Sequence, residues 1–147
     1  MKTFVTRFIY IIISIILLII SLFLPAGIAG GKSIDTLMCF LLGWFVLFDG
    51  EISWLANPML IISWFCLAIN KTKISTITSL LAVLLSLSFL FSKEIILNEA
   101  GHKGPIESYG LGYFLWLASC MVILAGSLLI LKTKNKKETD PYTPSVS

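Results

Sequence analysis

Charged residues are scarce in this sequence, at 13% of 147 residues, whereas soluble domains usually carry about a quarter. Hydrophobic residues make up 57% of the chain, and its mean hydropathy is +0.95. One soluble domain of this length cannot bury that much apolar surface. The composition therefore predicts an integral membrane protein.

Residue types that carry catalysis or bind metals are also few. His102 is the single histidine, and Cys39, Cys66 and Cys120 each lie alone inside an apolar run, without a CxxC pair. No HExxH, GxSxG or phosphate-binding Gly-Lys loop is present. We therefore expect no enzymatic activity, no cofactor and no metal site. The cysteines are interpreted as small buried hydrophobic residues.

Three apolar runs have the length of a bilayer crossing: residues 4–24, 74–92 and 109–131. The first follows Lys2 and Arg7 and precedes Gly27-Ile28-Ala29, a pattern that a cleaved signal peptide also has. The apolar part of a signal peptide usually has about 7–15 residues. We therefore favour an uncleaved first helix.

A fourth apolar region, residues 36–69, is too long for one straight crossing and is interrupted by Asp49, Gly50 and Glu51. Asn57-Pro58 predicts a second interruption, since Asn is a favoured N-cap and Pro is favoured at the first helical position. We expect two short helices, 36–48 and 58–70, with residues 52–56 able to extend the second.

The distribution of lysine and arginine predicts the topology, because basic residues near helix ends favour the cytoplasmic side. If residues 36–70 cross once, three basic residues lie outside: Lys32, Lys93 and Lys103. The other eight lie inside: Lys2, Arg7, Lys71, Lys73, Lys132, Lys134, Lys136 and Lys137. A second crossing there would reverse this bias, so four crossings with both termini in the cytoplasm are expected.

The expected fold is an all-α integral membrane protein. It is a four-helix transmembrane bundle with a broken second segment and an ordered outer loop, forming one domain over residues 1–131. Residues 132–147 lack apolar content and are expected to be a disordered cytoplasmic tail.

The first candidate functional region is the broken segment, which contains Asp49, Glu51 and Asn57. Ionisable groups at membrane depth mark ion or substrate sites. The alternative, which we favour, is a shallow segment near the outer interface, with Trp44 and Trp54 as anchors at headgroup level.

The second candidate region is the outer loop 93–108, which holds Glu99 and His102 and is followed by Tyr109. A metal site there would combine one imidazole with Glu99 and Glu107, a weak ligand set for zinc. A turn over residues 100–104 between two short extended stretches is the favoured interpretation.

Small residues recur at helical spacing in two of the apolar runs. One set is Ser75, Ser79, Ala82 and Ser86, and the other is Gly112, Ser119 and Gly126 with Ala118 and Ala125. In lipid, small residues let helix backbones approach closely. We expect packing within the chain, with self-association as the alternative.

Three stretches resemble small four-helix inner-membrane proteins of bacteria to which no activity is assigned. They are residues 56–60 (ANPML), 97–101 (LNEAG) and 109–119 (YGLGYFLWLAS), and the resemblance covers residues 42–119. It implies a bacterial cytoplasmic membrane and carries over no site residues.

The function that we expect is that of a non-enzymatic accessory or assembly component of a membrane complex. Its partners would be the lipid bilayer and a membrane protein or a second copy of the chain. Nucleic-acid binding is not expected, because the basic residues lie at the ends of apolar runs rather than on one face. The alternatives are transport of an ion or small solute through Asp49 and Glu51, and immunity against a membrane-acting toxin.

Overall fold

The computed structural model describes residues 2–96 and 103–138. Its α-helices are α1 (Lys2–Leu22), α2 (Thr36–Leu42), α3 (Ala56–Ala68), α4 (Thr72–Ser88) and α5 (Leu111–Glu138). Short 3-10 helices are η1 (Gly43–Asp49), η2 (Ser53–Leu55) and η3 (Phe89–Phe91). The strands are β1 (Pro25–Ala29), β2 (Lys32–Asp35), β3 (Glu94–Ile96) and β4 (Lys103–Tyr109).

In the described part of the chain, three helical segments are long and apolar enough to cross a membrane: Phe4–Leu22, Thr72–Phe91 and Leu111–Lys136. They coincide with the three apolar runs of the sequence. In lipid the backbone groups have no water to bond to, so an isolated crossing segment adopts a helix. We expected a disordered tail over residues 132–147, but helix α5 continues to Glu138, so residues 132–138 are helical.

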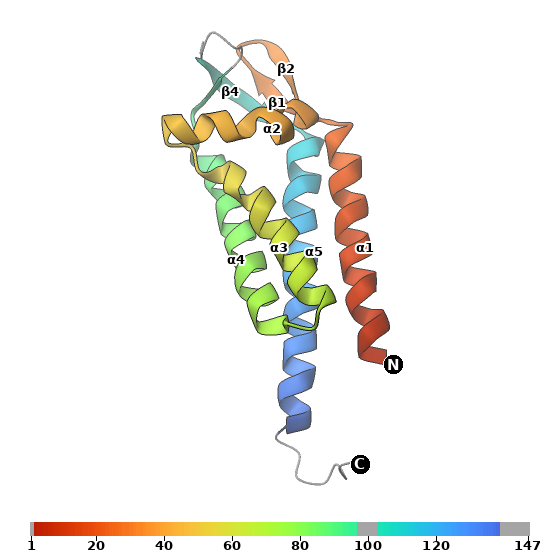
Figure 1. Cartoon of the computed structure of the whole chain (residues 1–147). Helices are drawn as coiled ribbons and strands as arrows, with labels where there is room; N and C mark the ends of the chain where they lie inside the picture. The colour runs from red at the N-terminus through yellow and green to blue at the C-terminus, as the bar shows by residue number, and fades with distance from the viewer. Residues whose placement is uncertain (1, 97–102, 139–147) are drawn as a thin grey trace.

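Four helices, α1, α3, α4 and α5, lie side by side and are called the packed helices below (Figure 1). Helix α1 packs on α5, α5 on α4, and α4 on α3. The N-terminus, the α3–α4 turn and the end of α5 point to one end of the molecule. The sheet lies at the other end, which we call the sheet end, and α2 lies across the packed helices there.

The all-α expectation is wrong, because the chain also forms a four-stranded antiparallel sheet in the order β2-β1-β4-β3. Strands β1 and β2 form a hairpin whose turn residues Gly30 and Gly31 have φ angles of 56° and 73°, a conformation that glycine adopts without steric cost. Gly27 also lets β1 approach β4, since a Cβ there would lie 2.3 Å from the Ser108 carbonyl oxygen. Strands β1 and β2 have five and four residues and no regular alternation, so their sequence indicated a loop.

The outer loop contains the two extended stretches that we expected, β3 and β4, paired in antiparallel register. Strand β4 begins at Lys103, so the last two residues of the expected turn 100–104 belong to the strand. The first three lie outside the described residues. The loop thus contributes half of the sheet and leads directly into α5.

The second segment is broken, as expected, but the break lies in one place only. Helix α2 begins at Thr36 and is followed by η1, and the chain turns at Gly50, whose φ is 85°. From Ser53 the chain is helical through η2 into α3, with Leu55 at the N-cap. The expected interruption at Asn57-Pro58 is therefore wrong. Asn57 lies inside the first turn of α3, where Pro58 is also tolerated.

Helix α3 ends in a Schellman motif that makes a tight turn into α4. Asn70 has a φ of 68°, and asparagine is, after glycine, the usual residue at this left-handed position. The Lys71 N–H donates to the Cys66 carbonyl at 2.8 Å, and the Asn70 N–H donates to the Leu67 carbonyl at 3.2 Å. Helices α3 and α4 consequently run antiparallel.

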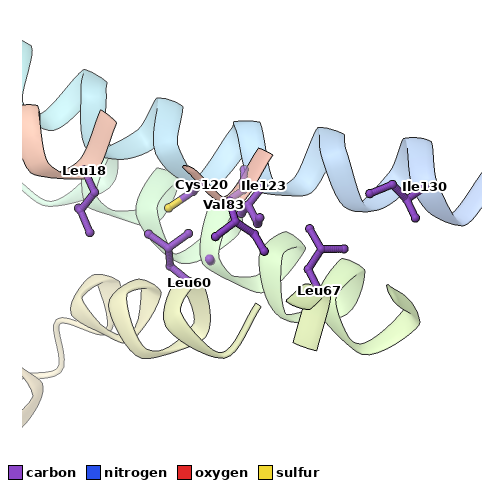
Figure 2. Close-up of a cluster of buried hydrophobic side chains, with 9 residues drawn as sticks. Leu18, Leu60, Leu67, Val83, Cys120, Ile123 and Ile130 are labelled. Carbon is purple, nitrogen blue, oxygen red and sulfur yellow. The ribbon is translucent and has the colours of Figure 1, made fainter. Parts of the chain in front are cut away.

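Buried apolar side chains from all four packed helices form one core. Figure 2 shows Leu18 of α1, Leu60 and Leu67 of α3, Val83 of α4, and Cys120, Ile123 and Ile130 of α5 gathered together. Cys120 is buried as expected, Cys39 and Cys66 are half-buried, and none of the three forms a disulfide. Outward-facing apolar side chains such as Ile77, Leu84 and Leu128 are about half exposed.

Most residues of the two sets of small residues pack inside the chain, as expected, but Ala125 is exposed. Ser75, Ser79, Ala82, Ser86 and Ser119 are completely buried. A Cβ at Gly126 would lie 2.4 Å from the Tyr10 ring. Helices α1 and α5 therefore approach closely because position 126 has no side chain.

Replacing Gly126 with leucine should separate α1 from α5, because the new side chain would overlap the Tyr10 ring. We expect a loss of about 1–3 kcal/mol in unfolding free energy, the usual cost of overpacking. Thermal unfolding in detergent measures it. Ala125→Leu is the matched control, since Ala125 is exposed on the same helix. Equal stability of the two variants would contradict the close approach.

Candidate functional site

Glu51, one of the two candidate carboxylates of the broken segment, lies between η1 and η2 at the sheet end. Its Oε1 accepts a hydrogen bond from the Ser53 backbone N–H at 3.2 Å. Its Oε2 accepts a hydrogen bond from the Ser92 hydroxyl. Ser92 directly follows η3, so this carboxylate joins the start of the α3 segment to the end of the α4 segment.

Tyr109, the last residue of β4, lies beside Glu51. Its hydroxyl donates to the Phe89 carbonyl at 3.1 Å and lies 3.5 Å from the Ser92 carbonyl oxygen. Burial raises the pKa of the Tyr109 phenol above its ordinary value, and the negative charge of Glu51 raises it further. Ser92 is thus the common neighbour of both candidate residues.

An aromatic column leads from Tyr109 into the packed helices. The Tyr109 and Tyr113 ring centroids are 5.1 Å apart, and those of Tyr113 and Trp116 are 5.9 Å apart. The Tyr113 hydroxyl donates to the Ser86 carbonyl at 2.9 Å, which ties α5 to α4. The hydroxyl groups of both tyrosines therefore have hydrogen-bond partners on neighbouring elements.

Asn57 lies at the Trp116 end of this column. Its side chain is 5% exposed, and its Oδ1 accepts a hydrogen bond from Trp116 Nε1 at 2.8 Å. The amide that we expected to cap a helix instead joins α3 to α5. In hydrocarbon an unbonded indole N–H would be costly, so this bond fixes how the two helices face each other.

The structure therefore places Tyr109 beside Glu51, whereas Asn57 lies at the other end of the aromatic column. The side chain of Asp49, as well as Glu99 and His102, lies outside the part of the chain that the structure describes. Glu107, the other expected metal ligand, accepts a hydrogen bond from the Gly31 N–H at 2.9 Å and so supports the β1–β2 turn. The described residues contain no group of three potential metal ligands.

Trp54, an expected headgroup anchor, contacts the protein instead. Its indole Nε1 donates to the Phe40 carbonyl at 2.9 Å, and a Cβ at Gly43 would lie 2.4 Å from its Cδ1 atom. These contacts hold α2 and η1 against η2. Trp44 is 41% exposed and stacks on Phe45 with a centroid distance of 3.8 Å, and its role as an interfacial anchor stays a prediction.

Serine side chains connect the packed helices further along the core. The Trp64 indole donates to the Ser14 hydroxyl at 2.9 Å, and Ser14 donates to the Ser119 carbonyl at 2.8 Å. The Ser75 hydroxyl lies 2.9 Å from the Ser63 carbonyl oxygen and 2.8 Å from the Ser127 hydroxyl. These two relays join α1 with α3 and α5, and α4 with α3 and α5.

Our sequence reasoning noted the small residues of α4 and α5 but missed these hydrogen bonds. It also missed Ser92, Trp116 and Ser14. One available signal was the spacing of seven residues between Ser14 and Ser21 and between Ser79 and Ser86, which places each pair on one helix face. The partners could not be read from spacing, because they lie on other helices.

The arrangement as a whole is that of a closed, hydrogen-bonded core. Among the described residues, every buried side-chain nitrogen or oxygen has a hydrogen-bond partner. The Glu51 carboxylate can accept hydrogen bonds. Its observed partners are a backbone N–H and a serine hydroxyl that also connect elements of the fold.

Removing the Asn57 acceptor should destabilise the protein. Asn57→Leu leaves the Trp116 indole N–H without a partner, and we expect a loss of about 1–2 kcal/mol in unfolding free energy. A double-mutant cycle with Trp116→Phe isolates the pair, with an expected coupling energy of about 0.5–2 kcal/mol. Additive effects of the two changes would contradict the hydrogen bond.

The raised pKa of Tyr109 predicts a loss of stability in alkali. The folded state keeps the phenolic proton to higher pH than the unfolded state does, so this contribution is complete below pH about 10 and is lost as pH rises further. Thermal unfolding of wild type and Tyr109→Phe between pH about 7 and about 12 measures it. The wild type should lose more stability over this range; parallel curves would contradict the prediction.

Comparison with known proteins adds no relative with a similar site. No family model matches the chain, and no curated protein and no solved structure matches it. The resemblance to small bacterial membrane proteins stays a prediction. The function of this region is therefore inferred from its own contacts.

Proposed function

We propose that this chain is a multi-pass protein of the bacterial cytoplasmic membrane that acts without catalysis, as an accessory or assembly component of a membrane complex. Three helices of membrane length support the setting. The observation that carries the proposal is that every described polar side-chain atom buried in the core has a hydrogen-bond partner within the protein. The surface is then the part of the molecule that is available to bind another molecule.

The arrangement of the helices supports four crossings with both termini in the cytoplasm. Thr72–Phe91 has 20 residues and spans about 30 Å, the thickness of the hydrocarbon layer. The shorter apolar segment Ser53–Ala68 runs beside it and would make the second crossing. The start of α1, the α3–α4 turn and the end of α5, to which Arg7, Lys71 and Lys132 belong, then lie at the end that the lysine bias assigns to the cytoplasm (Figure 1).

The surface that we assign to a partner is the outward side of α2 and η1. It consists of six exposed apolar side chains: Leu37, Met38, Leu41, Leu42, Trp44 and Phe45. This segment is held rigidly by Trp54 and lies across the packed helices instead of along them. It would present an apolar ridge at the level where the outer leaflet meets water, beside the sheet.

The contacts of Glu51 disfavour the transport alternative. A transported ion would have to replace the hydrogen bonds from Ser53 and Ser92, and these bonds connect the α3 and α4 segments. A carboxylate that carries an ion needs free oxygen atoms facing a water-filled path. Both oxygens of Glu51 instead accept hydrogen bonds from the protein.

Site-specific photocrosslinking in native membranes tests the accessory function. A benzophenone amino acid at Leu41 should form adducts with another protein or a second copy of the chain. The same group at Ile77, which is 60% exposed on α4, is the matched control and should react mainly with lipid. If neither position gives a protein adduct and the chain purifies as a monomer in mild detergent, the proposal is wrong.

A further inference from the structure

Two cationic side chains from different helices converge on the C-terminal end of α3. The Arg7 guanidinium of α1 lies 3.5 Å from the Ala68 carbonyl oxygen. The Lys134 ammonium of α5 donates to the Asn70 carbonyl at 3.2 Å, to the Asn70 side-chain oxygen at 2.6 Å and to the Thr72 hydroxyl at 3.0 Å. Cations are favourable beside the last carbonyls of a helix, which carry a partial negative charge.

Lys134 acts here as a positioning residue. An ammonium group has three donors, and all three have oxygen acceptors that carry no net charge. Its bonds hold the α3–α4 turn against α5, so they place the first residues of α4 beside the basic part of α5. The positive charge of Lys134 itself is not neutralised by these acceptors.

Two further basic side chains, Lys71 and Lys73, lie at the start of α4 beside this junction, and both are exposed. Lys132 and Lys136 of α5 are also exposed, but each is two residues from Lys134 and so faces another side of the helix. The acidic side chains that the structure describes, Asp35, Glu51, Glu94 and Glu107, belong to the sheet end instead. The described side chains at this junction therefore form a patch of one sign.

Exposed apolar side chains begin immediately beside this patch. Ile69 at the turn is 61% exposed, and Ile74 and Ile77 on α4 are 46% and 60% exposed. An anion bound at Lys71 and Lys73 would thus adjoin a surface suited to an acyl chain. A phospholipid has this combination of phosphate and hydrocarbon, whereas a free phosphate would use the basic side chains alone.

We propose that Lys71 and Lys73 bind the headgroup phosphate of an anionic phospholipid at this junction, where Arg7 and Lys134 hold the end of α3 in place. The lipid chains lie along Ile74 and Ile77 of α4. Arginine and lysine are the side chains that bind phosphate best, and each basic residue near an anionic membrane surface adds to the attraction. This inference is independent of the proposed accessory function.

The test uses the full-length chain in dodecyl maltoside micelles, with phosphatidylglycerol or phosphatidylcholine added stepwise. Phosphatidylglycerol should raise the unfolding temperature, and phosphatidylcholine should have little effect. In Lys71→Gln/Lys73→Gln, half-saturation should need about thirtyfold more phosphatidylglycerol, the sum of two surface lysine contributions. Lys32→Gln/Lys93→Gln removes two exposed lysines from the sheet end and is the matched control; its response should equal that of wild type.

Three results would overturn the proposal: equal stabilisation by both lipids, an equal loss of response in the two lysine variants, or full stabilisation by glycerol phosphate. The last result would assign the junction to a free phosphate compound. If Lys71→Gln/Lys73→Gln unfolds without lipid, Lys73→Gln alone replaces it, since Lys73 is exposed. Native mass spectrometry gives a second readout, with fewer phosphatidylglycerol molecules retained by the variant.

Discussion

The hydrogen bonds that Trp64, Ser14 and Ser119 make with one another hold three helices in one arrangement. Trp64 of α3 donates to Ser14 of α1, and Ser14 donates to a carbonyl of α5. In hydrocarbon these groups have no water as an alternative partner, so separating the helices would leave them unbonded. The close approach at Gly126 and the apolar core around Ile123 depend on the helices lying in these positions.

The two ends of the packed helices are built from different chemistry. At the sheet end, Glu51, Ser92 and Tyr109 connect short elements through hydrogen bonds, and the aromatic column continues this contact into the core. At the opposite end, Arg7 and Lys134 bond to carbonyl groups of α3. Because both ends are tied, the surface of α2 and the basic junction are presented by a rigid frame.

Local sequence patterns predicted much of this fold, because a long apolar run in lipid has few alternatives to a helix. The runs that became α1, α4 and α5 were recognised, and so was the break after Asp49. The sheet was not, since Pro25–Ala29 and Lys103–Tyr109 pair across most of the chain and carry no alternation of their own. Asn57 was predicted to cap a helix, because an asparagine side chain suits an N-cap as well as a buried hydrogen bond.

The sequence by itself thus determined the approximate positions of three helices that are long and apolar enough to cross a membrane, and the separation of basic from acidic residues. These properties depend on neighbours in the chain and on the thickness of the bilayer. Only the tertiary structure decided which polar groups meet. Trp116 and Asn57 are 59 residues apart, and Lys134 and Asn70 are 64 residues apart. Such pairs form because packing brings a donor on one helix within about 3 Å of an acceptor that lies far away in the sequence.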